Sequence, residues 1–199
     1  DDEGGGVPSV SAAAFVEDIN RDPVVVVDGL TKNWRYPGMR LSWTLGPKEV
    51  IERVISAGSF LDGGPSHPTQ RAALPLIERS IADQEARAIQ TLFREKRDLM
   101  TGRLSAMGMK LHAIPNGAFY VFADVSGLPG LGDGMQLFRE ALERKVIVVP
   151  GEFFDVNPGR RRRNESSLLR GFVRFSYGPS LETISLGLDR LEELINERS

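Results

Sequence analysis

Lys32 and Arg40 are the two residues whose types and spacing could do chemistry at one site. Both lie in the segment GLTKNWRYPGMR at residues 29–40, directly after a run of four valines at residues 24–27. A partly desolvated lysine amine has a lowered pKa and can bond covalently to an aldehyde. A guanidinium grips a phosphate through two parallel hydrogen bonds. The segment is therefore either a solvated loop or the site of an aldehyde cofactor that carries a phosphate.

The composition excludes several other kinds of site. The 199 residues include no cysteine and only two histidines, His67 and His112, so we expect neither a thiol nucleophile nor a metal centre. A net charge of −2 offers no general attraction for nucleic acid or a membrane surface. No apolar run approaches the roughly 20 residues that span a bilayer, and the acidic start DDEGGG is unlike a signal peptide. We therefore expect the protein to be cytoplasmic and to bind no nucleic acid, membrane or metal.

Turn signals and apolar runs divide the first part of the chain into short elements. Ser9 or Ser11 would cap the first helix, Pro47 would lie in the first turn of the second, and Pro75 would interrupt the third. We expect a short helix, a strand covered on both faces, a second strand, a helix and an interrupted helix at residues 9–19, 24–27, 41–45, 47–60 and 69–78.

The second part begins with the longest helical pattern, at residues 79–107, which would connect two parts of the structure. After Gly108 the pattern predicts a small α+β unit, with Asp133 as the cap of its first helix and an additional short strand at residues 111–114. Its main elements are a strand, a helix, two strands and a helix, at residues 118–125, 134–145, 146–150, 172–177 and 181–197.

The surroundings of Lys32 give the two cations a specific meaning. The order strand, lysine, arginine, strand and helix in VVVVDGLTKNWRYPGMRLSWTLGP resembles the cofactor-lysine motif of class I/II aminotransferases of fold type I, which depend on pyridoxal 5'-phosphate. The blocks LDGGPSHPTQRAALPLI, PNGAFYVFADV, VIVVPGEFF and GFVRFSYG also resemble the family and follow its order. The resemblance implies an α/β fold: the end of the mixed-sheet large domain at residues 1–80, a connecting helix at 81–108 and a small α+β domain at 109–199.

The same resemblance implies roles for residues near the cofactor. Lys32 would form the Schiff base with pyridoxal 5'-phosphate and then move a proton between the substrate Cα and the cofactor C4′. Arg40 would bind the phosphate, and Thr31 and Ser66 would be further cofactor contacts. From position alone, Lys32 could equally be a solvated loop residue, and Ser66 could lie in a plain loop.

Three further residues are implied for the substrate. Arg174 would clamp the substrate α-carboxylate, and its apolar neighbours favour a half-buried strand, where an unpaired charge is costly. Asn116 and Tyr120 could border the substrate pocket, although a simple turn and a core tyrosine explain them equally well. The arginine run at residues 160–163 is expected to be solvated.

The sequence departs from the family at two places. Gly29 stands where the family usually has a phosphate-binding hydroxyl, so we expect weaker or rearranged phosphate contacts. The family also needs a pyridine-facing aspartate, a glycine-rich phosphate turn and a stacking aromatic ring well before the lysine, whereas only 31 residues precede Lys32. Asp1 and Asp2 are poor candidates for that aspartate. We therefore expect a C-terminal portion of such an enzyme, inactive by itself, from a whole protein that is a homodimer.

The leading interpretation is transamination between an α-amino acid and a 2-oxo acid. The same scaffold also serves decarboxylases, lyases and aminocyclopropane-carboxylate synthases. Two other interpretations are an aminotransferase-like sensor domain of a winged-helix transcription regulator and an inactive fragment. The sequence does not name the amino acid.

Overall fold

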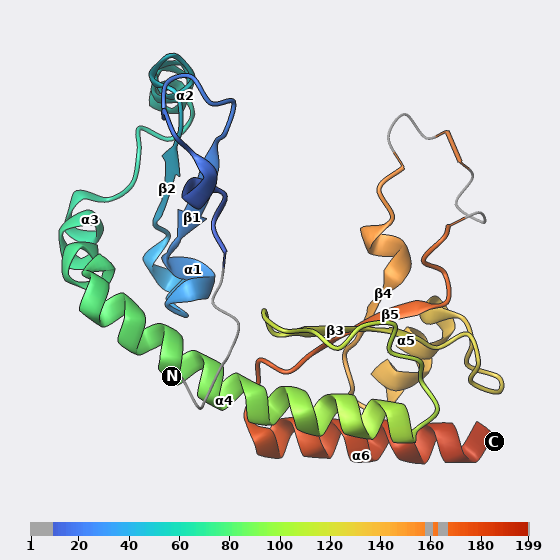
Figure 1. The fold of residues 1–199 in the computed structure, drawn as a ribbon. Helices are drawn as coiled ribbons and strands as arrows, with labels where there is room; N and C mark the ends of the chain where they lie inside the picture. Colours follow the sequence, from blue (N-terminus) through green and yellow to red (C-terminus); the bar gives the residue numbers. More distant parts are fainter. Residues whose placement is uncertain (1–9, 158–160, 163–166, 199) are drawn as a thin grey trace. The chain divides into compact units, whose positions relative to one another are not determined.

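The protein consists of two compact units, which we call the first unit, Asp1–Ile89, and the second unit, Gln90–Ser199 (Figure 1). The computed structural model describes residues 10–157, 161–162 and 167–198.

The first unit contains a two-stranded antiparallel sheet and several short helical segments. A small core of Leu30, Leu41 and Ala73 joins them, with Trp34 and Trp43 packed against it. In chain order the elements are η1 (Ala12–Phe15), β1 (Val26–Gly29), α1 (Leu30–Asn33), η2 (Pro37–Met39), β2 (Ser42–Leu45), α2 (Lys48–Leu61), α3 (His67–Ala73), η3 (Leu74–Ile77) and the start of α4 (Arg79–Ala106).

Two predictions for the first unit were wrong. The helix expected at residues 9–19 is, among the described residues, only the 3-10 turn η1, which Ser11 caps. All of η1 is exposed, so no buried face offsets the cost of helix nucleation. The valine strand starts at Val26 rather than residue 24, and Val27 is 69% exposed instead of covered. Only β2 pairs with this strand in the described part of the unit.

The other expected elements of the first unit are confirmed with small shifts. Strand β2 and helix α2 form as expected, although Pro47 is the residue before α2 rather than a member of its first turn. The interrupted helix forms as α3 followed by the 3-10 turn η3, which carries Pro75.

The second unit is a three-stranded antiparallel sheet with helices packed on one face (Figure 1). Strand β5 is central, with β3 and β4 on its two sides. Helix α6 runs alongside the later part of α4, and Arg103 of α4 forms 2.8 Å ion pairs with Asp189 and Glu192 of α6. Besides α4 (Arg79–Ala106), the elements are β3 (Tyr120–Asp124), α5 (Gly134–Glu143), β4 (Val149–Pro150), η4 (Gly151–Phe154), β5 (Phe172–Ser176) and α6 (Leu181–Arg198).

Alternation along β3 and β5 sorts their side chains between two faces. Val121, Ala123, Val173 and Phe175 are at most 4% exposed and lie in the hydrophobic core. Successive strand residues point to opposite faces, so the residues between them lie on the other face. Arg174 is one of these, and the strand pattern thereby places its charge away from the core.

The element order predicted for the second unit is confirmed, as are the long helix and the cap. Helix α4 spans 28 residues from Arg79, and the Asp133 side chain accepts hydrogen bonds from the N–H groups of Met135 and Gln136. The strand expected at residues 111–114 was wrong: only Lys110 pairs there, with Asp124. The strand expected at residues 146–150 forms only at its last two residues, Val149 and Pro150, which pair with β5.

Gly29 is the residue on which the packing of β1 against β2 depends. A Cβ at Gly29 would lie 2.7 Å from the Leu41 carbonyl oxygen, whereas a Cβ at Gly38 would meet nothing within 4 Å. We expect Gly29→Ser to lower the free energy of unfolding of the first unit by about 1–3 kcal/mol, as overpacking does. Gly38→Ser, the matched control, should leave it nearly unchanged. Urea unfolding followed by Trp34 and Trp43 fluorescence measures both variants, and equal stabilities would contradict the close-packing account.

Candidate functional site

Lys32 lies in the short helix α1, directly after β1, on a backbone that the core holds in place. Leu30 is fully buried, its N–H donates to the Leu41 carbonyl at 3.1 Å, and its carbonyl accepts from the Tyr36 N–H at 3.0 Å. The Lys32 residue itself is exposed. The turn therefore presents a lysine side chain from a fixed backbone.

Trp34 and Arg35 tie the same turn to the rest of the first unit. The Trp34 indole N–H donates to the Leu76 carbonyl at 2.8 Å, and its ring meets Trp43 edge-on with centroids 5.9 Å apart. Arg35 adopts a left-handed backbone conformation with φ 60° and forms a 3.0 Å ion pair with Glu85. Positive φ is a sparsely populated conformation for a non-glycine residue, and it persists only where surrounding contacts impose it.

Arg40 lies on the same loop at its far end. It also has a positive φ of 50°, and its Nη1 donates to the Pro37 carbonyl at 2.9 Å. Thr31 is half-buried directly before Lys32, and Thr31, Lys32 and Arg40 all belong to the segment of residues 29–40. Ser66 lies elsewhere in the chain, exposed and directly before α3, and its side chain makes no capping hydrogen bond.

These residues fit two parts of an aldehyde cofactor that carries a phosphate: the aldehyde and the phosphate group. A primary amine suits the aldehyde, and a guanidinium with a neighbouring hydroxyl suits the phosphate. The ring nitrogen finds no candidate among the described residues before Lys32. Asp18, Asp22 and Asp28 all accept hydrogen bonds from backbone N–H groups of their own turns. Asp1 and Asp2 lie outside the described residues.

Arg174 occupies the middle of β5, opposite Phe122 of β3 and Val149 of β4. Its guanidinium carbon lies 4.0 Å from the Tyr120 ring centroid and 4.5 Å from the Phe154 ring centroid. The structure records no carboxylate paired with this half-buried arginine within the described residues. Aromatic rings stabilise the cation without consuming its N–H donors, so the guanidinium can still bind a carboxylate from outside.

Asn116 lies in an exposed turn that is hydrogen-bonded to the buried Tyr177 side chain. The Tyr177 hydroxyl is within 3.3 Å of the Gly117 carbonyl and 3.2 Å of the Ala118 carbonyl, and Ala118 has a φ of 61°. Burial raises the pKa of Tyr177 above its ordinary value, and the positive charge of Arg97 opposes this in part. The turn leads directly into Tyr120, so the structure brings Tyr120 to Arg174 and places Asn116 at the start of the same segment.

Sequence reasoning missed a polar cluster around Asp124 on the same face of the sheet. His112 Nε2 lies 3.1 Å from one Asp124 carboxylate oxygen, and the Ser126 hydroxyl donates to the other at 2.6 Å. Burial disfavours the charged carboxylate, but hydrogen bonds from Ser126 and His112 outweigh it and lower the pKa of Asp124. Both His112 and Ser126 contact the aspartate, so this is not a relay to a nucleophile. The spacing of these residues carried no signal, because the contact depends on the pairing of Lys110 with β3.

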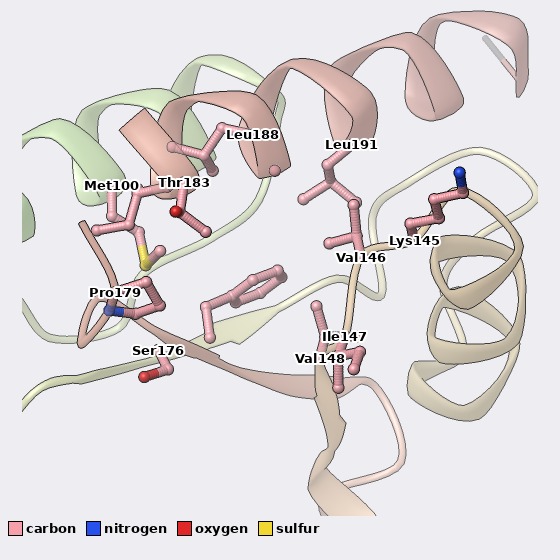
Figure 2. A pocket seen from close by; sticks show the side chains of 13 residues that line it. Met100, Lys145, Val146, Ile147, Val148, Ser176, Pro179, Thr183, Leu188 and Leu191 are labelled. Atoms are coloured by element: carbon pink, nitrogen blue, oxygen red, sulfur yellow. The ribbon is translucent and has the colours of Figure 1, made fainter. Parts of the chain in front are cut away.

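A small hollow in the second unit is separate from Arg174. It measures about 160 Å³, and Leu188 and Leu191 of α6 point toward Val146 and Val148 across it (Figure 2). Sites for small molecules usually enclose about 300–1,000 Å³. Because the hollow is smaller, mostly apolar and not lined by Arg174 or Tyr120, we do not assign it to the substrate.

The chain is similar to aminotransferases in both sequence and fold. A sequence profile described as aminotransferase class I and II matches residues 3–191. The chain is 28% identical to the probable N-acetyl-LL-diaminopimelate aminotransferase of Bacillus subtilis, over 93% of this chain and 42% of the relative. It is 31% identical to the aspartate/prephenate aminotransferase of Thermus thermophilus, over 86% of this chain and 40% of the relative.

Solved structures agree with the sequence relatives. The chain superposes with a TM-score of 0.75 and 25% identity on a Methanococcus jannaschii protein described as similar in its active site to kynurenine aminotransferases. The match covers 94% of this chain and 46% of that protein.

The chain belongs to the class I and II aminotransferase family. Its α/β fold matches that of aminotransferase structures over part of their length, which confirms the predicted fold class. The chain spans about 40% of the length of the curated relatives it matches. Among the residues that the structure describes, no helix is both long enough and apolar enough to cross a membrane.

The buried Tyr177 hydroxyl gives the second unit a pH dependence. A raised pKa means that the folded state keeps the phenolic proton longer than the unfolded chain does. Its stabilising effect is therefore complete below the unfolded value near about 10 and is lost as the pH rises through the folded value. We expect Tyr177→Phe to abolish this loss and the exposed control Tyr36→Phe to retain it. Urea unfolding followed by circular dichroism at several alkaline pH values measures it, and identical profiles for both variants would contradict the assignment.

Proposed function

We propose that the whole protein is a pyridoxal-phosphate-dependent aminotransferase that acts on an α-amino acid and a 2-oxo acid. The observation that carries the proposal is the loop of residues 29–40, whose core-anchored backbone presents Lys32 and, eight residues on, Arg40. Arg174 supports it from the second unit, as a half-buried guanidinium with aromatic neighbours and no carboxylate partner among the described residues.

The chemistry would be divided between the cofactor and these side chains. When bound, pyridoxal 5'-phosphate supplies an aldehyde and an electron-withdrawing ring that makes the Cα–H of an amino acid acidic. Lys32 would bond covalently to the cofactor until the substrate amine displaces it, and its freed Nζ would then take the proton from the substrate Cα and deliver it to C4′ of the cofactor. Arg40 would hold the phosphate.

The phosphate contacts would differ from those of relatives with a hydroxyl at the Gly29 position. A side chain there would meet the Leu41 carbonyl oxygen at 2.7 Å, so the strand pairing leaves no room for it. Thr31 is the nearest hydroxyl in the sequence and would serve in its place. Ser66 would be a further contact, if its loop reached the cofactor phosphate of a neighbouring subunit as the corresponding loop of the family often does.

Arg174 would bind the substrate α-carboxylate by two parallel N–H to O hydrogen bonds. Tyr120 and Asn116 would border the bound substrate, since Tyr120 contacts the Arg174 guanidinium and Asn116 opens the segment leading to Tyr120. One relative named above is called an N-acetyl-LL-diaminopimelate aminotransferase, and the other is called an aspartate/prephenate aminotransferase. A common α-amino and α-carboxylate group is what Lys32 and Arg174 could recognise.

The whole protein would be a homodimer in the cytoplasm. Exposed apolar side chains on α2 support an interface, because Phe60 is 92% and Leu61 is 83% exposed in the first unit. Large exposed apolar groups that lie together mark interaction surfaces in soluble proteins.

Borohydride trapping tests the assignment of Lys32. The whole protein would be incubated with pyridoxal phosphate, reduced and digested, and the labelled peptide identified by mass spectrometry. We expect the label on Lys32, and we expect Lys32→Ala to abolish it, because reduction fixes only an amine already bonded to the aldehyde. The other lysines of the chain serve as internal controls: Lys48, Lys96, Lys110 and Lys145.

Lys48→Ala is the matched variant, since Lys48 is also an exposed lysine of the first unit, paired with Glu52 at 3.8 Å. It should leave labelling of Lys32 unchanged. A label spread evenly over the lysines, or a label that survives Lys32→Ala at the same yield, would overturn the proposal.

A further inference from the structure

The Asp155 carboxylate accepts hydrogen bonds from several described residues of the long loop between η4 and β5. Asp155 accepts hydrogen bonds from both Nη atoms of Arg162, from the Ser167 hydroxyl at 2.6 Å and from the Leu168 N–H at 3.1 Å. We call Asp155, Arg162 and Ser167 the Asp155 clasp. The hydrogen bonds from Arg162 and Ser167 lower the pKa of Asp155 to about 2, so the carboxylate is charged at neutral pH.

A second pair of hydrogen bonds fixes Arg162 in the clasp. The Asn157 side-chain amide donates to the Arg162 carbonyl at 2.6 Å and accepts from the Arg162 N–H at 3.1 Å. Arg162 belongs to the arginine run at residues 160–163, for which sequence reasoning predicted solvation. That prediction fails for Arg162, whose side chain is 34% exposed, while its neighbour Arg161 is exposed. Arg160 and Arg163 lie outside the described residues.

The clasp begins directly after Phe154, the ring that contacts Arg174. Phe154 ends η4, and its ring lies 4.5 Å from the Arg174 guanidinium carbon and edge-on to Phe122 at 6.2 Å. At the start of η4, a Cβ on Gly151 would lie only 2.4 Å from the Leu169 carbonyl oxygen. The backbone is therefore closed on both sides of Phe154, by the Gly151 contact before it and by the Asp155 clasp after it.

We propose that the Asp155 clasp is a positioning device for substrate binding: it holds Phe154 against Arg174 and so fixes how the guanidinium meets a carboxylate. This inference rests on the proposed function, in which Arg174 binds the substrate carboxylate. Phe154, Asp155, Arg162 and Ser167 are positioning residues, since they act through Arg174. Ring contacts restrain the guanidinium while leaving its N–H donors for the ligand. A restrained guanidinium loses less entropy on forming two parallel hydrogen bonds than a free one does.

Two adjacent arginines provide a matched test in the whole protein. Arg162→Gln removes the charged partner of Asp155, whereas Arg161→Gln removes the same charge from the exposed neighbour. We expect Arg162→Gln to raise the KM for the amino-acid substrate by roughly tenfold, the scale of a lost cation–π contact, with kcat little changed. Arg161→Gln should change neither. A general loss of folded protein would instead lower the measured kcat with KM unaltered.

Phe154→Leu tests the same link without touching the clasp, because it removes the ring and keeps an apolar side chain. It should also raise the KM selectively, and it decides the question if Arg162→Gln fails to fold. The inference is overturned if Arg174→Gln raises the KM while Arg162→Gln and Phe154→Leu behave like Arg161→Gln. If Arg174→Gln itself leaves the KM unchanged, the proposed role of Arg174 fails instead. Borohydride labelling of Lys32 in each variant reports the cofactor end separately.

Discussion

The contact of the half-buried Arg174 guanidinium with two aromatic rings is the interaction on which the polar face of the second unit's sheet depends. Desolvating a charge is costly unless something stabilises it, and the rings of Tyr120 and Phe154 do so for Arg174 without occupying its donors. The strand alternation that buries Val173 and Phe175 places Arg174 on the opposite face. The core, the pairing of β5 with β3 and β4, and the closed backbone around Phe154 thus converge on one side chain.

In the first unit, Lys32 follows a backbone segment that core contacts and hydrogen bonds anchor. The packing there is close: Leu30 is fully buried, and Gly29 lies too near Leu41 for any side chain. Two positive-φ residues, Arg35 and Arg40, show that the loop is shaped by its contacts rather than by local preference. The same close packing leaves no room for a hydroxyl-bearing side chain at residue 29.

Much of the fold followed from local pattern, and the exceptions have physical causes. Helix α4 and the cap at Asp133 were predictable, because helical periodicity and capping depend on residues close in sequence. The strand expected at residues 111–114 was wrong, because strand formation depends on a partner that the sequence does not display. The covering expected for the valine strand was wrong for a related reason: Val27 is 69% exposed where the pattern indicated a buried strand.

The candidate site divides in the same way. Lys32, Arg40 and Arg174 could be nominated from motifs, since their spacing and flanks are local features. The ring of Phe154 over Arg174, the Asp155 clasp and the pairing of His112 with Asp124 could not, because these contacts join segments that only folding brings together. The composition of the arginine run at residues 160–163 indicated solvated side chains, whereas the Arg162 guanidinium donates hydrogen bonds to Asp155.

The central claim is that Lys32 performs the chemistry on a substrate whose carboxylate Arg174 binds. A single-turnover half-reaction tests it most directly: the whole protein, loaded with pyridoxal phosphate, is mixed with an α-amino acid and the 2-oxo acid is quantified. The account predicts stoichiometric 2-oxo acid, none from Lys32→Ala, and weaker binding of the amino acid in Arg174→Gln. Release of carbon dioxide or an amine in place of the 2-oxo acid, or undiminished turnover by Lys32→Ala, would contradict it.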